Sequence, residues 1–147
     1  MFFLIYRSVA NLSIGKSEVL DIWEESKNFN RTQNITGCLL YYNHEFVQYL
    51  EGEESVVEHL FGKIKMDWRH TKVCLLSSGH VNSREFEDWS MAFEDFTGPN
   101  YRLEYLKLLV SAYFEETASF KNLNPKTNKF WVVVRTLLAT QAVEKFK

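Results

Sequence analysis

The stretch GCLLYYNHEFVQYLEGEE, residues 37–54, decides the fold, because two runs of strand-forming residues flank a polar turn at 43–45. Side chains alternate between the two faces of a strand, so Phe46, Gln48 and Leu50 share one face of the second strand. Gln48 therefore places an amide between two bulky apolar neighbours, on the face that a core would occupy. A buried amide needs a hydrogen-bonding partner, and this partner is the main question that the sequence raises.

Composition favours one compact domain with a large core and no affinity for polyanions. The chain has 147 residues, of which 46% are apolar and 16% aromatic, and its formal net charge is −2. This charge gives no reason to expect binding to nucleic acid or to an anionic membrane. No run of about 18 apolar residues is present, and the apolar run at the N-terminus is short and has no basic leader. We therefore expect a cytoplasmic protein without a membrane-spanning helix.

The remaining core elements follow from hydrophobic periodicity on both sides of the hairpin. In chain order the pattern predicts a strand at 2–9, a helix at 17–30 with Ser17 as its N-cap, strands at 36–42 and 46–51, a helix at 53–65, and strands at 71–78 and 88–96. In the last strand, Trp89, Met91 and Phe93 are expected on one face. The order β-α-β-β-α-β with a fifth strand predicts a ferredoxin-like α+β fold, in which two helices pack on one face of a mixed sheet.

The pattern changes after Gly98-Pro99. Residues 100–116 are predicted to form a helix capped by Asn100, and residues 129–146 a second helix, although three consecutive valines weaken the second prediction. A helical extension of this length must dock on the sheet or on another chain.

Two readings explain Gln48. Tyr6 lies on the inner face of the first strand and has a phenol that also needs a partner when buried, while Asn30 ends the first helix. A hydrogen bond between Tyr6 and Gln48 inside an ordinary core would satisfy both groups. A polar ligand between the two helices would satisfy all three groups at once.

Four segments resemble the BLUF domain, a sensor of blue light using FAD. They are IYRSVA at 5–10, Asn30 followed by NITGCLLYYNHEFVQYLEG at 34–52, VVEHLFGKIKMDWRH at 56–70 and REFEDWSMAF at 84–93. The resemblance covers about residues 2–96 without an insertion, and the tyrosine, asparagine, glutamine, tryptophan and methionine occur in the order and spacing of the family.

The resemblance implies a role for each residue of the photoactive centre. Tyr6 matches the phenol that donates an electron and a proton to the excited flavin. Gln48 matches the glutamine that bridges this phenol and the flavin. Asn30 matches the asparagine that binds the edge of the flavin ring. Trp89 and Met91 match the pair on the last strand that responds when the glutamine rearranges.

The resemblance also implies the rest of the cofactor site. Asp67, Arg69 and His70 match the segment near the ribityl chain and the ring edge. Ile22 on the first helix and Ile64 on the second would form apolar walls. The implied cofactor is FAD, with FMN or riboflavin as the other flavins that this site could hold.

In organisation and output, the resemblance implies a photoreceptor that is not an enzyme, with a photosensor domain at 1–97 and a helical extension at 98–147. It would signal through protein contacts, as a homo-oligomer with a downstream protein partner. Two other functions stay open: a ferredoxin-like interaction or ligand-binding module without photochemistry, and, more distantly, an acylphosphatase-like hydrolase.

The cysteines and histidines point to no further chemistry. Cys38 and Cys74 lie in strand-like apolar runs, and we expect both to be buried, reduced thiols. The four histidines and two cysteines show no metal-ligand spacing, so no metal site is expected.

Overall fold

The fold is a five-stranded sheet between two layers of helices. The structure, a computed structural model, describes residues 1–96 and 125–145. Its elements are β1 (Phe2–Ala10), α1 (Lys16–Thr32), β2 (Thr36–Tyr42), β3 (Glu45–Gly52), α2 (Glu54–Met66), β4 (His70–His80), β5 (Ala92–Asp95) and α4 (Asn128–Lys145). The strand order is β4-β1-β3-β2-β5. This arrangement confirms the ferredoxin-like prediction with its fifth strand.

The β2–β3 hairpin closes as the sequence indicates. Asn43 and His44 both adopt positive φ angles, 44° and 68°, as the two central residues of a tight hairpin turn require. The turn fixes the antiparallel register of β3 with β2, in which Gln48 lies opposite Leu39. On its other side β3 pairs antiparallel with β1, and there Gln48 lies opposite Tyr6. The pairing of β1 with β3 therefore brings Tyr6 and Gln48 to adjacent positions in the middle of the sheet.

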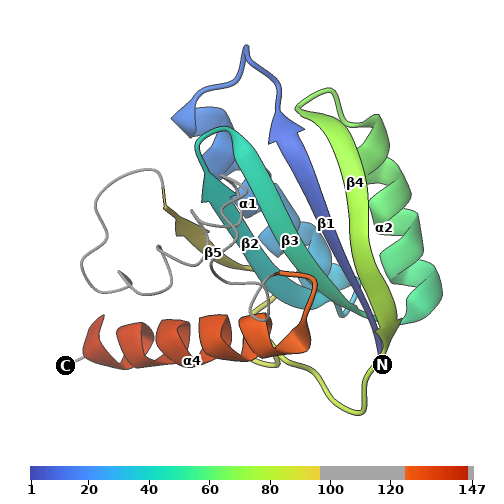
Figure 1. The fold of residues 1–147 in the computed structure, drawn as a ribbon, viewed down its shortest axis with the longest axis vertical. Coiled ribbons are helices and arrows are strands. Elements are labelled where there is room, and N and C mark those ends of the chain that lie inside the picture. Colours follow the sequence, from blue (N-terminus) through green and yellow to red (C-terminus); the bar gives the residue numbers. More distant parts are fainter. Residues whose placement is uncertain (97–124, 146–147) are drawn as a thin grey trace.

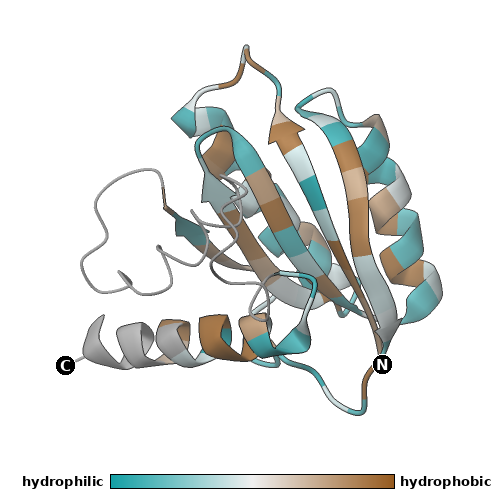
Figure 2. Cartoon of the chain, in the orientation of Figure 1, coloured by the Kyte–Doolittle hydropathy of each residue, from teal (hydrophilic) through white to brown (hydrophobic). Residues whose placement is uncertain are grey.

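Each face of the sheet has its own core. On one face, α1 and α2 pack over a cluster that includes Leu4, Phe46 and Leu50 (Figure 1). On the other face, α4 packs Phe130 and Trp131 onto the strands. Figure 2 shows hydrophobic residues along the strands and in the first turns of α4. The C-terminal extension was expected to dock either on the sheet or on another chain, and α4 docks on the sheet; the predicted helix at 100–116 lies outside the described residues.

Three predicted details differ from the structure: the N-cap of α1, the length of the last strand and the burial of Cys74. The N-cap of α1 is Gly15 rather than Ser17, and the Glu18 carboxylate accepts a hydrogen bond from its N–H at 2.8 Å. The last strand covers only Ala92–Asp95, because the carbonyl groups before it bond to other partners, described below. Cys38 is buried as expected, but Cys74 is exposed, because β4 is an edge strand whose residues are mostly exposed or half-buried.

None of the described helices is long and apolar enough to cross a membrane.

Candidate functional site

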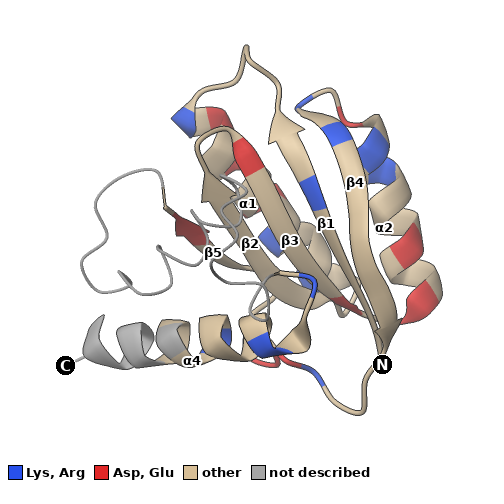
Figure 3. Ribbon diagram, viewed as in Figure 1, with Lys and Arg blue, Asp and Glu red and all other residues tan. Residues whose placement is uncertain are grey.

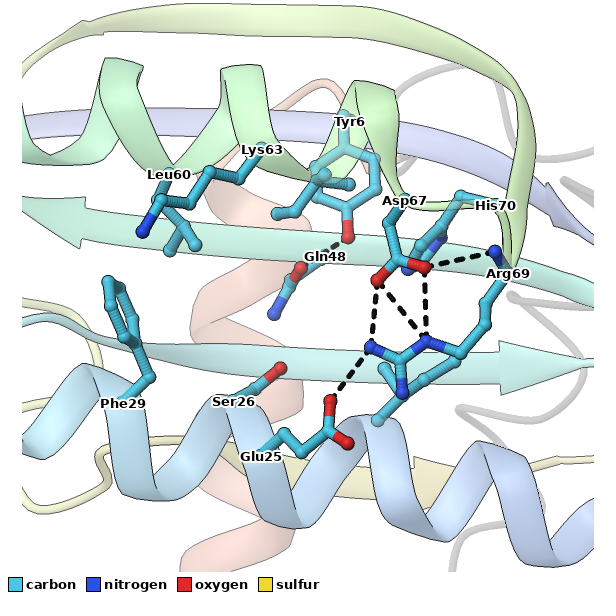
Figure 4. A pocket seen from close by; sticks show the side chains of 12 residues that line it. Tyr6, Glu25, Ser26, Phe29, Gln48, Leu60, Lys63, Asp67, Arg69 and His70 are labelled. Atoms are coloured by element: carbon cyan, nitrogen blue, oxygen red, sulfur yellow. Dashed lines mark hydrogen bonds and ion pairs between the residues drawn. The ribbon is translucent and has the colours of Figure 1, made fainter.

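A cavity of about 280 Å³ lies between α1 and α2 (Figure 4). Its volume is near the lower end for ligand pockets, roughly 300 Å³. Seven of the eight residues that the resemblance assigns to the cofactor line it; the exception is Asn30. The lining residues are Tyr6, Ile22, Glu25, Ser26, Phe29, Gln48, Leu60, Lys63, Ile64, Asp67, Arg69 and His70.

A chain of contacts runs from Tyr6 to Gln48, which both line the cavity, and on to Met91, which does not. The Tyr6 hydroxyl donates to Gln48 Oε1, and Gln48 Nε2 donates to Met91 Sδ at 3.3 Å. Burial, with a smaller contribution from the Asp67 carboxylate, raises the pKa of Tyr6, so the phenol stays protonated at neutral pH. Gln48 is only 3% exposed and has a second N–H on Nε2. The arrangement can therefore accept a proton at one end of the amide and release one at the other.

Asn30 has a buried oxygen without a partner. Its Nδ2 donates to Ser90 O at 3.2 Å, but Oδ1 is the one buried side-chain nitrogen or oxygen in residues 1–96 and 125–145 that has no hydrogen bond. Such a group costs roughly 1–3 kcal/mol, so an uncompensated one suggests a ligand donor. An N–H of a flavin ring would satisfy it, and the chain thus fits the cofactor that the resemblance implies.

Charged groups gather where α2 ends. Arg69 donates to both Asp67 oxygens and to Glu25 Oε2 at 2.8 Å, which ties the β4 end of the cavity to α1. Burial opposes the charged carboxylate, yet the hydrogen bonds and charge of Arg69 prevail and lower the pKa of Asp67. Figure 3 shows basic residues at this end of α2, where Lys63 lies 4.8 Å from the centre of the Phe29 ring.

His70 is a buried, neutral side chain beside Tyr6. Ser8 Oγ lies 2.8 Å from His70 Nδ1, and the ring packs against Phe46 with centroids 5.0 Å apart. Burial lowers the pKa of His70 to about 4; the Asp67 carboxylate raises it only in part. His70 therefore contributes a polar but uncharged surface to the cavity at neutral pH.

Trp89 and Met91 lie on opposite sides of the sheet, so the expectation that they share one strand face was wrong. Met91 belongs to the cluster under α1 and α2, whereas Trp89 packs against the cluster under α4, with its ring 6.1 Å from that of Phe86. Because both precede β5, strand alternation does not apply to them. Met91, not Trp89, contacts Gln48.

Five lining residues were not among the predicted cofactor residues: Glu25, Ser26, Phe29, Leu60 and Lys63. A signal for them was present. Phe29 follows Ile22 by seven residues, and Leu60 precedes Ile64 by four, so helical periodicity places each on the same helix face as a predicted wall residue. The described residues contain no group of three or more His, Cys, Asp or Glu side chains that could hold a metal ion.

Comparison with known proteins agrees with this geometry. The family model for BLUF, "Sensors of blue-light using FAD", matches residues 1–92. A photoactivated adenylate cyclase subunit beta from Euglena gracilis is 33% identical over 89 residues; the match covers 60% of this chain and only 10% of the subunit, so the chain spans about one tenth of this curated relative.

Two solved structures cover almost the whole chain. The photo-activated state of BlsA aligns with a TM-score of 0.70 and 32% identity, over 89% of this chain and 91% of that one. BlrB, a BLUF protein in its dark state, aligns with a TM-score of 0.74 and 26% identity, over 92% and 95% of the two chains. The chain therefore belongs to the BLUF family, flavin-binding sensors of blue light. Residues 1–92, which match the family model, are a photosensor rather than an enzyme.

Proposed function

We propose that the flavin binds in the cavity between α1 and α2, held by Asn30, Gln48, Arg69 and the apolar walls at Ile22 and Ile64. The contact chain from Tyr6 through Gln48, which both line this cavity, to Met91 is the observation that supports the proposal most strongly. When bound, flavin supplies the absorption of blue light and an oxidant in its excited state.

The residues then have distinct tasks. Because burial keeps the phenol protonated, Tyr6 can lose an electron only if its proton leaves as well. Gln48 Oε1 receives this proton along the existing hydrogen bond, and Nε2 can release one toward the cavity. After the electron and the proton return to Tyr6, Gln48 is left in a rotated or tautomeric form, which changes the hydrogen bond that Met91 Sδ accepts. This change in hydrogen bonding is the light signal.

Absorption spectroscopy of the purified protein tests this function. We expect a yellow protein whose flavin band shifts reversibly to the red under blue light, and extraction followed by chromatography identifies the flavin as FAD, FMN or riboflavin. A colourless preparation that also fails to take up any of the three flavins would instead favour the interaction module without photochemistry.

We further propose that the extension at 98–147 transmits the signal and that α4 is its contact with the sheet. The buried Glu51 carboxylate accepts hydrogen bonds from Glu85 N and Phe86 N, both at 2.7 Å, and so fastens the loop before Met91 to β3. Arg135 on α4 donates to Glu85 Oε1 at 2.6 Å. A displacement of Met91 would therefore pass along this loop to α4.

The output would be a change in protein contacts, in a homo-oligomer or with a downstream partner. Hydrogen exchange compared between light and dark tests the route: we expect altered protection in residues 85–95 and in α4. Size measurement and affinity capture under both conditions test the contacts. Unchanged exchange in both segments would exclude this route while leaving the photochemistry intact. The cytoplasmic location stays a prediction.

A further inference from the structure

The segment that precedes β5 is fastened largely by side chains of α1. Three consecutive carbonyl oxygens accept hydrogen bonds: Trp89 O from Gly37 N at 3.2 Å, Ser90 O from Asn30 Nδ2 at 3.2 Å and Met91 O from Trp23 Nε1 at 2.9 Å. Only the first donor belongs to the sheet. Trp23 and Asn30 are seven residues apart, two turns along one face of α1, so a single helix edge holds both carbonyls.

Trp23 is itself held by two contacts to its ring. The ring stacks on Phe93, with centroids 5.2 Å apart and an interplanar angle of 20°. The Lys27 ammonium lies 4.6 Å from the ring centroid. With the ring plane fixed, the direction of the indole N–H is fixed too, and it points at Met91 O. Trp23 therefore links α1, which borders the cavity, to the residue whose sulfur contacts Gln48.

Met91 needs such support because its side chain does not fix its own position. Methionine is unbranched and has three rotatable bonds, so its sulfur can follow small displacements of the backbone. Its Sδ lies 3.3 Å from Gln48 Nε2, a distance that a modest movement of the Met91 backbone would lengthen beyond contact. The hydrogen bond at Met91 O thus controls a contact at the amide of Gln48.

We propose that Trp23 is a positioning residue of the photosensor: its indole N–H holds Met91 against Gln48 and thereby favours the dark arrangement over the light-induced one. The inference rests on the proposed roles of Gln48 and Met91. Loss of the N–H weakens the arrangement to which the protein reverts, so reversion in the dark slows.

Trp23→Phe tests the proposal, because it retains an aromatic ring on Phe93 and removes the donor. From the usual net value of one hydrogen bond, we expect reversion after illumination to slow by about threefold to tenfold. The matched control is Trp68→Phe, the same chemical change at a side chain that is 62% exposed, which should revert at the wild-type rate. If Trp23→Phe does not fold, 3-benzothienylalanine at position 23, which replaces the N–H by sulfur in nearly the same shape, makes the same test.

A second readout reports the hydrogen bond itself. The chain has three methionines, Met1, Met66 and Met91, so the carbonyls can be labelled with ¹³C and observed by infrared spectroscopy. In the Trp23 variant we expect one labelled carbonyl band to move to higher frequency. Wild-type protein without any light-induced shift would contradict the proposed function. A normal shift in wild type, with reversion in the Trp23 variant as fast as wild type or faster, or with no displaced carbonyl band, would overturn only the role of Trp23.

Discussion

The two faces of the central sheet share their strands but not their chemistry. Gln48 and Tyr49 are neighbours in β3, yet Gln48 lies at a cavity among polar groups, whereas Tyr49 lies between Phe3, Phe86 and Trp131 in a packed aromatic cluster. Of the five buried polar or charged residues in the described part of the chain, four are on the cavity side or at its edge: Ser8, Asn30, Gln48 and His70.

This difference indicates that the two faces of the sheet have different roles. The face under α4 resembles an ordinary protein core, in which close packing of large side chains stabilises the fold. The face under α1 and α2 keeps an open volume and an unsatisfied amide oxygen, both of which weaken a fold. We infer that the α4 face provides stability and the cavity face provides function, and the following experiments test this separation.

The largest effect is expected from Tyr6→Phe. The variant removes the source of the electron and proton, so the light-induced red shift should disappear completely while flavin stays bound. Stability should fall by about 1–3 kcal/mol, because Gln48 Oε1 loses its donor at a buried position. Light-minus-dark spectra and urea unfolding measure both quantities. The double variant with Gln48→Leu removes both partners, and a photocycle that survives in it would refute the role of this pair.

Trp131→Ala should do the opposite: it should lower the stability strongly and leave the light-induced red shift unchanged. The side chain is fully buried between Tyr49 and Phe86, and its Nε1 donates to Pro125 O at 2.8 Å. Truncation of a buried aromatic residue costs about 3–5 kcal/mol. The folded fraction should still show the red shift. Val132→Ala, at a neighbouring side chain that is 41% exposed, serves as the control and should change the unfolding free energy by less than about 0.5 kcal/mol.

Stability should depend on pH through His70. The unfolded side chain takes up a proton near its ordinary pKa of 6.5, but the folded one only near 4, because burial disfavours the charged form. The unfolded state thus binds more protons than the folded state between these two pH values. The stability that depends on a neutral His70 is therefore fully present above pH 6.5 and is lost as the pH falls toward 4.

The size of this loss is at most about 3 kcal/mol, at 1.36 kcal/mol per pH unit. Urea unfolding of the wild type and of His70→Phe between pH 4 and 7 isolates it, since carboxylates titrate in both proteins. If the free energy of unfolding changes equally with pH in the two proteins across this range, His70 does not cause the effect.

Arg135→Gln should have the smallest effect on stability. The guanidinium is 42% exposed, and pairs at such positions are worth about 1 kcal/mol or less. The red shift should be unchanged. If the loop from Glu85 to Met91 transmits the signal, however, the light-dependent change in hydrogen exchange of α4 should diminish. An undiminished response in α4 would show that packing alone links the two faces.

Local patterns predicted most of the fold because they are set by neighbours in sequence. The alternation in β3 placed Gln48 on the inner face, and the polar turn fixed its register with β2. The extent of the last strand could not be read in this way. Its alternating residues suggest a strand from 88, but two donors on α1, 60 and 68 residues away in the sequence, bind the carbonyls of Ser90 and Met91.

The candidate site was predicted by resemblance more than by pattern. Spacing alone left open whether Gln48 and Tyr6 form an ordinary core pair. The structure adds two observations that sequence cannot supply, a cavity beside that pair and a buried oxygen on Asn30 without a partner. Exposure of Cys74 was also missed, since an apolar run does not reveal whether its strand is central or at an edge.

The two cysteines differ in their access to solvent, so their reactivity reports changes in the packing of the chain. Cys74 is open to solvent, whereas Cys38 is sealed in the cluster that includes α4, where burial raises the pKa of its thiol and suppresses reaction. In an excess of thiol reagent, one cysteine is modified at once, and the second is modified only at the rate at which that cluster opens. Counting labelled thiols by mass, in darkness and under blue light, therefore measures how readily this cluster opens in the unmutated protein.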